Sequence, residues 1–117
     1  MADYPKQGEI WWALFFEGGE RPALVVSRNE LNRGRFILVV PCTSSQVEER
    51  AVYRNHVLLP SGSGGLTSDT IAQTHLIQPI EVGYLERKLG ELDTEQLAEV
   101  LLAIAWTIDL FDTAQPS

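Results

Sequence analysis

Residues 36–45 read Phe-Ile-Leu-Val-Val-Pro-Cys-Thr-Ser-Ser, and this stretch decides the fold. Its first five residues are apolar on both faces, which is typical of a strand buried in the centre of a sheet. Because proline cannot donate to a ladder, Pro41 is expected to break the pairing and bend the chain outward at residues 42–45. The stretch therefore predicts a central buried strand that ends beside a polar turn.

Further strands are expected on both sides of this one. Apolar or alternating runs predict strands at residues 9–16, 23–27, 56–59, 70–80 and 85–92, with Pro22 at the start of the second. Glycine-rich turns separate several of them. Strands followed by a single helix predict a mainly β protein, a compact and largely antiparallel barrel with a helix packed on it. The length of 117 residues fits one domain, with its core at about residues 8–112.

The expected helix is at the C-terminal end. Asp93 is a good N-cap, and Gln96 three residues later can complete a capping box. Apolar residues then follow helical spacing and predict one buried face: Leu97, Val100, Leu101, Ile104, Ile108 and Phe111.

Composition bounds the class of protein. The longest apolar runs, residues 10–16 and 36–42, are far too short for a bilayer, and residues 1–6 do not resemble a secretory signal. The single cysteine, Cys42, excludes an internal disulfide and a multi-cysteine metal site. We therefore expect a cytoplasmic protein with no membrane partner, no metal and no cofactor.

The net charge of −7 argues against a nucleic-acid partner, but the charges are unevenly distributed. Residues 91–112 carry no Lys or Arg. Residues 21–54 carry six arginines against three glutamates. Two interpretations of that stretch remain open: a locally positive surface, or scattered solvated charges.

Several short motifs resemble, in order and spacing, the MazF/PemK/Kid family of toxins. They are Gly8-Glu9-Ile10-Trp11, the Arg-Pro strand at residues 21–27 with Asn29 after it, Val40-Pro41-Cys42-Thr43-Ser44, Gly65-Leu66, Ser68-Asp69-Thr70-Ile71, and Leu89-Gly90 before the acidic helix. The similarity covers about residues 8–110. It implies a small SH3-like barrel that forms a homodimer, cleaves single-stranded RNA without a metal and is blocked by an antitoxin with a disordered acidic tail.

This sequence departs from the family pattern at two places. The loop at residues 17–20 is short, whereas it is long in many relatives. His75 also stands where relatives commonly have a carboxylate, and Gln73 replaces an arginine that some relatives carry. The set of acid–base groups is therefore altered.

The predicted catalytic residues are Arg21, Thr43 and His75. A guanidinium binds a phosphate bidentately, a hydroxyl can donate to a phosphate oxygen, and imidazole titrates near neutrality. Each also has a structural interpretation: a surface arginine, a turn hydroxyl and a strand histidine held by the backbone. His56 is expected to be structural.

Four residues are predicted to contact RNA: Ser44, Asn29, Gln73 and Trp12. Ser44 can share the task of Thr43, and Trp12 offers a surface on which a base can stack, although core packing is the alternative. Leu102, Trp106 and Leu110 form an outward apolar stripe on the helix, which predicts an interface. Dimer contact is the first choice for that stripe and antitoxin contact the second.

Three functions remain from the sequence. The first is an active endoribonuclease toxin, giving 2′,3′-cyclic phosphate and 5′-hydroxyl ends. The second is a gyrase poison like CcdB, which shares the fold, and the third is a catalytically weakened binding module. The Arg21 and Thr43 motifs favour the first, whereas Gln73, His75 and the acidic charge favour the third.

Overall fold

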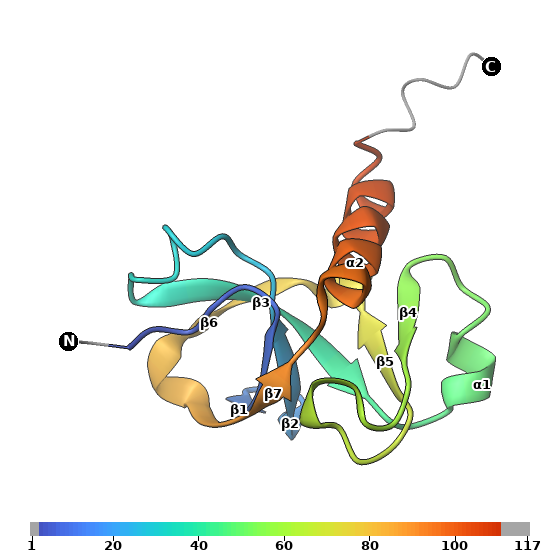
Figure 1. Ribbon diagram of the computed structural model, residues 1–117, viewed down its shortest axis with the longest axis horizontal. Helices are drawn as coiled ribbons and strands as arrows, with labels where there is room; N and C mark the ends of the chain where they lie inside the picture. Colours follow the sequence, from blue (N-terminus) through green and yellow to red (C-terminus); the bar gives the residue numbers. More distant parts are fainter. Residues whose placement is uncertain (1–2, 111–117) are drawn as a thin grey trace.

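The computed structural model describes residues 3–110, which form a bent antiparallel sheet with one long helix against it (Figure 1). The chain order is β1 (Glu9–Phe15), β2 (Gly19–Val25), β3 (Phe36–Thr43), α1 (Val47–Arg50), β4 (His56–Leu59), η1 (Ser63–Gly65), β5 (Thr70–Gln73), η2 (Thr74–Leu76), β6 (Gln78–Glu81), η3 (Val82–Tyr84), β7 (Leu85–Glu91) and α2 (Thr94–Thr107). The mainly β architecture with a C-terminal helix is confirmed. No helix within residues 3–110 is long and apolar enough to cross a membrane.

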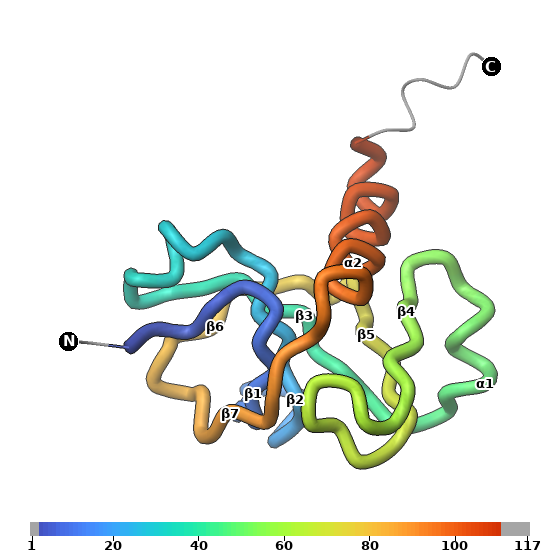
Figure 2. Tube along the Cα trace, in the orientation of Figure 1, coloured from blue at the N-terminus to red at the C-terminus, as the bar shows by residue number. Residues whose placement is uncertain are grey.

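The sheet curls toward a barrel but is not closed by hydrogen bonds. Its strand order is β4-β5-β3-β2-β1-β7, and β6 pairs with the first half of β3. The outer strands β4 and β7 do not pair with each other, and the turn η1 lies against β7 instead, as the trace in Figure 2 lets the reader follow. At this contact Gly64 and Gly65 lie directly on the backbone of Leu89 and Gly90.

β3 is the central strand, as predicted, and it changes partners along its length. Its first half pairs with β6 and β2, whereas Cys42 and Thr43 pair with β5. The β2–β3 ladder ends at the pair Ala23–Pro41, as predicted for the proline, but β3 itself continues for two residues, because Cys42 and Thr43 pair with β5. The predicted burial of both faces is wrong at the start of the strand, where Phe36 is 56% and Leu38 39% exposed.

Pro22 lies within β2 rather than at its start, which corrects the predicted boundary. The β2–β3 ladder ends at the pair Ala23–Pro41, so the next pair would be Pro22 with Cys42. In an antiparallel ladder every second pair of opposite residues is hydrogen-bonded. The Val26 N–H donates to the Leu38 carbonyl, so the pairs Leu24–Val40 and Pro22–Cys42, two and four residues further along, occupy hydrogen-bonding positions as well. Because Pro22 has no N–H to give, the two strands separate there while β2 stays paired with β1.

Two clusters of apolar side chains occupy opposite faces of the sheet. The larger one lies under α2 and includes Ile10, Leu24, Val40, Leu59 and Val100. The second lies on the other face and includes Ala13, Val25, Val39 and Ile80.

Helix α2 begins as predicted, because the Asp93 carboxylate accepts from the backbone N–H of Gln96 at 2.8 Å. The reciprocal half of the capping box is wrong: the Gln96 side chain donates to Ser63 Oγ of η1 at 2.7 Å. The helix ends at Thr107, so Ile108 is 62% exposed instead of buried. Phe111 lies outside the described residues.

The strand predicted for residues 70–80 is interrupted. β5 ends at Gln73, and the turn η2 carries the chain to β6. Thr74 N–H still donates to the carbonyl of Asn55 at 3.2 Å, in line with the β4–β5 register, and the turn is closed by the bond from Ile77 N–H to the Thr74 carbonyl at 3.2 Å.

Candidate functional site

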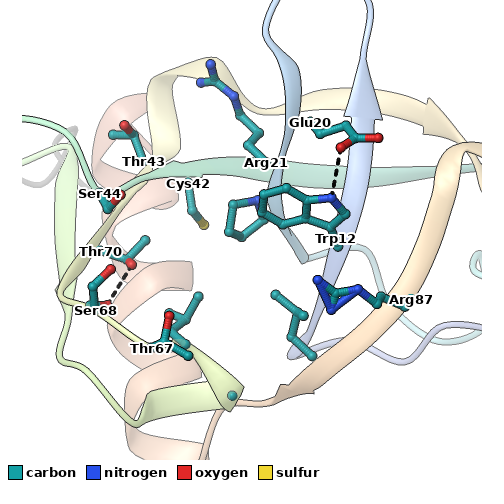
Figure 3. Close-up of a pocket in the computed structure, with 14 residues that line it drawn as sticks. Trp12, Glu20, Arg21, Cys42, Thr43, Ser44, Thr67, Ser68, Thr70 and Arg87 are labelled. Atoms are coloured by element: carbon teal, nitrogen blue, oxygen red, sulfur yellow. Dashed lines mark hydrogen bonds between the residues drawn. The ribbon is translucent and has the colours of Figure 1, made fainter.

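A pocket of about 490 Å³ opens where β2 and β3 separate. Its walls come from β1, β2, the end of β3, residues 65–70 and β7. The lining residues are Trp12, Glu20, Arg21, Pro22, Cys42, Thr43, Ser44, Gly65, Leu66, Thr67, Ser68, Thr70, Arg87 and Leu89 (Figure 3). Because Pro22 has no N–H to donate, β2 and β3 separate at this point, and the pocket lies between them.

Arg21 and Thr43 meet at one rim of the pocket, as Figure 3 shows. The pairing of Ala23 with Pro41, extended by two residues, sets them opposite each other and on the same face of the separating strands. The predicted association of these two residues therefore follows from strand register.

The Arg21 side chain lies across the β1–β2 turn. One of its terminal nitrogens, Nη2, donates to the carbonyl of Gly18 at 3.0 Å. A Cβ atom at position 18 would lie 3.0 Å from the guanidinium, so the glycine makes room for it. Among the described residues, Arg21 Nε is buried and has no hydrogen-bond partner, while the residue as a whole is half-buried and lines the pocket.

Thr43 is half-buried at the end of β3, and its Oγ1 accepts from the N–H of Ser45 at 3.1 Å. Its own hydroxyl hydrogen is therefore directed elsewhere. Ser44 is exposed beside it, and hydroxyls of residues 67, 68 and 70 line the same pocket. Burial raises the pKa of the Cys42 thiol to about 12, so this lining residue stays protonated at neutral pH.

The opposite wall contains two charged residues that the sequence did not single out, Glu20 and Arg87. Trp12 lines the pocket between them: its Nε1 donates to Glu20 at 3.3 Å, and the Arg87 guanidinium lies 5.8 Å from its ring (Figure 3). Neither residue belongs to the quoted family motifs, and only the pairing of β1 with both β2 and β7 brings them together. The lining thus carries two arginines and one carboxylate, although the whole chain is acidic.

His75 and Gln73 do not line this pocket. His75 is exposed on η2, and its Nδ1 lies 2.7 Å from Asn55 Nδ2. Burial, the neighbouring His56 and Arg50 lower the pKa of His75 below 6.5. Gln73 is 5% exposed, and within the described part of the chain its Oε1 has no partner. A buried amide cannot contact RNA in this conformation. His75 and Gln73 thus lie outside the lining of this pocket, and the predicted role of His75 stays a prediction.

Asn29 belongs to a different surface hollow, with Tyr4, Gln7, Arg28, Glu30 and Arg33. Its Oδ1 accepts from the N–H of Gln7 at 2.8 Å, which gives it a structural role in holding the N-terminal segment. The predicted RNA contact by Asn29 is therefore separate from the pocket of Arg21 and Thr43.

The predicted apolar stripe on α2 is exposed. Leu102, Trp106 and Leu110 are 61%, 40% and 56% exposed, and the Arg54 guanidinium lies 5.1 Å from the Trp106 ring. Leu102 and Leu110 are therefore not buried by any other part of the described chain. The stripe stays a predicted interface.

Comparison with known proteins assigns this chain to a family. The family described as PemK-like, MazF-like toxin of type II toxin–antitoxin system matches residues 6–108. Endoribonuclease MazF9 of Mycobacterium tuberculosis is 34% identical over 118 residues, covering 91% of this chain and 98% of that protein. A MazE–MazF crystal structure from Deinococcus radiodurans is 25% identical with a TM-score of 0.73, covering 92% of this chain and 97% of that one.

A second solved structure, an endoribonuclease in complex with its cognate antitoxin from a mycobacterial species, has a TM-score of 0.76 at 22% identity. It covers 91% of this chain and 96% of that chain, and shows the same fold. From the family match and the mycobacterial relative together, this chain belongs to the PemK-like, MazF-like toxin family of type II toxin–antitoxin systems.

Proposed function

We propose that the chain is an endoribonuclease toxin that cleaves single-stranded RNA in the pocket between β2 and β3. The observation that carries this proposal is the position of Arg21 and Thr43 at one rim of the pocket, where a half-buried guanidinium group and a half-buried hydroxyl group line the same opening. A charged donor and a hydroxyl donor side by side suit the two non-bridging oxygens of a phosphodiester. The names of the relatives, endoribonucleases of the MazF type, support the same reaction.

The proposed reaction uses the substrate's own 2′-hydroxyl and requires no metal. The 2′-oxygen attacks phosphorus and loses its proton, the bond to the 5′-oxygen breaks, and that oxygen gains a proton. The products are a 2′,3′-cyclic phosphate and a 5′-hydroxyl end. Arg21 neutralises the charge that builds on the phosphorane, and Thr43 donates to a second oxygen. Donors of this kind contribute about 10²–10³-fold each.

Glu20 is the one carboxylate among the described residues that line the pocket, and it is the group we assign to accept the 2′-hydroxyl proton. Its hydrogen bond from Trp12 Nε1 orients the carboxylate and holds the indole ring, which offers a face for a base. A general base contributes about 10²–10⁴-fold. This assignment replaces the predicted acid–base role of His75.

The departures at positions 73 and 75 do not count against activity. They suggested a weakened binding module because they alter the family's acid–base groups, yet neither side chain lines the pocket. The contacts proposed for the phosphate are therefore intact.

The partner proposed for the toxin is a cognate antitoxin with an acidic tail. Solved structures of relatives contain an antitoxin, and Arg21 and Arg87 give this pocket a rim that suits carboxylates as well as phosphates. An acidic tail would therefore compete with RNA for the same cations. Its RNA substrate sets the proposed site of action in the cytoplasm.

The test is incubation of the purified protein with a long single-stranded RNA in the presence of EDTA, followed by mapping of the new ends. Discrete cuts with cyclic phosphate and 5′-hydroxyl ends are expected, and they should disappear in Arg21→Ala. Arg21→Lys should recover little activity, since an ammonium cannot make a bidentate contact. Arg28→Ala, at an exposed arginine paired with Glu30 at 3.3 Å, is the matched control. RNA that stays intact would overturn the proposal, and inhibition of gyrase by the same sample would favour the CcdB-like alternative.

A further inference from the structure

A chain of hydrogen bonds joins Thr43, at the end of β3, to His56, at the start of β4. The N–H of Ser45 donates to Thr43 Oγ1 at 3.1 Å, and Arg50 Nε donates to the carbonyl of Ser45 at 3.0 Å. His56 Nδ1 lies 2.8 Å from the carbonyl oxygen of Arg50. Because a carbonyl only accepts, Nδ1 carries the hydrogen and donates it. The two ends of the β3–β4 connection are thus tied together through Arg50.

This connection needs an external hold. Gln46 has a φ of 55°, a left-handed conformation that is unfavourable for a residue with a side chain. Helix α1 is only four residues long, and its N-cap makes no side-chain hydrogen bond. Isolated helices of that length are not stable in water. The position of Ser45, and with it the direction of the Thr43 hydroxyl, therefore depends on the contacts made by Arg50.

The second ring nitrogen of His56, Nε2, makes no hydrogen bond within the described residues. His56 Nε2 is buried and without a partner among residues 3–110, and so is Oε1 of Gln73, the residue directly opposite on β5. Buried polar atoms are nearly always paired, and an unpaired one costs stability. An apolar residue would remove that cost, so the Nδ1 contact is the feature that distinguishes histidine here.

We infer that His56 is a positioning residue for RNA cleavage, which acts through Arg50 to fix the turn at Thr43–Ser45. The inference rests on the proposed function, because it assumes that the Thr43 hydroxyl donates to the phosphate. With Ser45 N–H bonded to Thr43 Oγ1, the hydroxyl hydrogen points away from the Ser45 amide and stays available for a ligand in the pocket that Thr43 lines. His56 itself does not line the pocket, so it is expected to act through Arg50 and not by direct contact with RNA.

The experiment compares two replacements of His56. An asparagine amide nitrogen lies near the position of histidine Nδ1, whereas a glutamine amide nitrogen lies near Nε2. We expect His56→Gln to lower kcat about tenfold, the scale of one lost hydrogen bond, with KM within about twofold. His56→Asn should recover most of the rate. Arg50→Gln breaks the next link and should resemble His56→Gln. Glu49→Gln, at an exposed position of α1, is the control and should leave kcat unchanged.

A purely structural role is excluded by coupling to Thr43. In a Thr43→Val background, His56→Gln should have almost no further effect on kcat, because the group that it positions is already gone. Equal rates for the asparagine and glutamine variants, or a full additional loss in the Thr43→Val background, would overturn the inference. If His56→Gln does not fold, Arg50→Gln decides the same comparison.

A measurement without RNA separates this inference from the proposed function. Hydrogen exchange at the Ser45 amide should be faster in His56→Gln than in the parent, and close to the parent in His56→Asn. If Thr43→Val cleaves RNA at the parent rate, the proposed site is wrong, while altered Ser45 exchange still supports the hydrogen-bond chain. Unchanged Ser45 exchange in both His56→Gln and Arg50→Gln would refute the chain itself.

Discussion

The backbone of Gly65 lies so close to Leu89 that a Cβ atom at position 65 would stand 1.9 Å from the Leu89 carbonyl oxygen. Gly90 has the reciprocal contact, since its Cβ would lie 2.5 Å from the carbonyl carbon of Gly64. This backbone-on-backbone contact brings η1 against β7 at the place where the outer strands of the sheet do not pair. It also sets one wall of the pocket, because Gly65 and Leu89 both line it.

Gly65→Ala is therefore expected to destabilise the protein by more than about 2 kcal/mol, since strained backbone conformations and displaced packing each cost about 1–3 kcal/mol. The φ of Gly65 is 81°, so a side chain is unfavourable there even apart from the clash. Denaturant unfolding measures the change. Gly83→Ala is the matched control, because a Cβ at that position meets no atom within 4 Å; it should stay within about 0.5 kcal/mol of the parent. Equal stabilities for the two variants would contradict the contact.

Thr43→Val should reduce kcat about 10²-fold while leaving the fold unchanged, because valine keeps the shape of threonine and removes the donor. Thr43→Ser keeps the hydroxyl and should retain most of the activity. The two variants are compared by cleavage of one RNA under single-turnover conditions. Similar rates for the valine variant and the parent would remove Thr43 from the reaction.

Glu20→Gln should lower kcat by about 10²-fold or more, because an amide cannot accept the proton of the 2′-hydroxyl. The glutamine can still accept from Trp12, so binding of RNA should change little. Glu17→Gln is a suitable control, since Glu17 lines the neighbouring hollow on the other side of Arg21. A parent-like rate for Glu20→Gln would mean that the proton leaves by another route.

Glu9 should give the protein a stability that depends on pH. Burial would raise its pKa, but hydrogen bonds from Lys6 N–H, Trp11 Nε1 and Lys88 lower it below the ordinary value of 4.5. A carboxyl whose pKa is lower in the folded state than in the unfolded state stabilises the folded protein. The full contribution is present at pH values above the pKa of the unfolded state, and it is lost as the pH falls through the pKa of the folded state. Glu9→Gln should thus be less stable than the parent at pH 7, and the difference should shrink below about pH 4.5. Thermal unfolding of both proteins between pH 7 and 3 provides the measurement, and a constant difference would argue against this account.

Trp106→Asp is expected to weaken self-association. Burying a carboxylate within the exposed stripe of Leu102, Trp106 and Leu110 costs several kcal/mol, on the order of the whole contribution of a central interface residue. Light scattering should show a larger species for the parent and a mass nearer the 13.1 kDa chain for the variant. Phe16→Asp serves for comparison, since Phe16 is 88% exposed and lies in the turn between β1 and β2, outside α2. Dissociation by Phe16→Asp alone would move the interface to the sheet, and loss of antitoxin binding alone would assign the stripe to the antitoxin.

The sequence predicted the features that depend on local chemistry. The Asp93 cap, the central position of β3 and the association of Arg21 with Thr43 all follow from residue type, period or motif order. Pro22 was misplaced because the loss of a donor matters only on the side where a ladder continues, and no local pattern tells which side that is.

What depends on the third dimension was missed. Glu20 and Arg87 are 67 positions apart in the chain numbering and meet only because β1 pairs with both of their strands. His75 was expected on a strand, yet the chain leaves the sheet after Gln73 in the turn η2, which the bond from Ile77 N–H to the Thr74 carbonyl closes. The alternation of residues 70–75 does not indicate this turn.

The hydrogen bond from the Gln96 side chain to Ser63 Oγ connects the first turn of α2 directly to the turn η1. Gly65 of η1 and the following Leu66 both line the pocket. A protein bound to α2 and an RNA bound in the pocket would therefore both contact parts of the chain that this hydrogen bond connects. If a protein bound to α2 changes the position of η1, it changes the affinity of the pocket for RNA, and that change is a coupling free energy between the two sites. By reciprocity, bound RNA changes the affinity of α2 for that protein by the same factor.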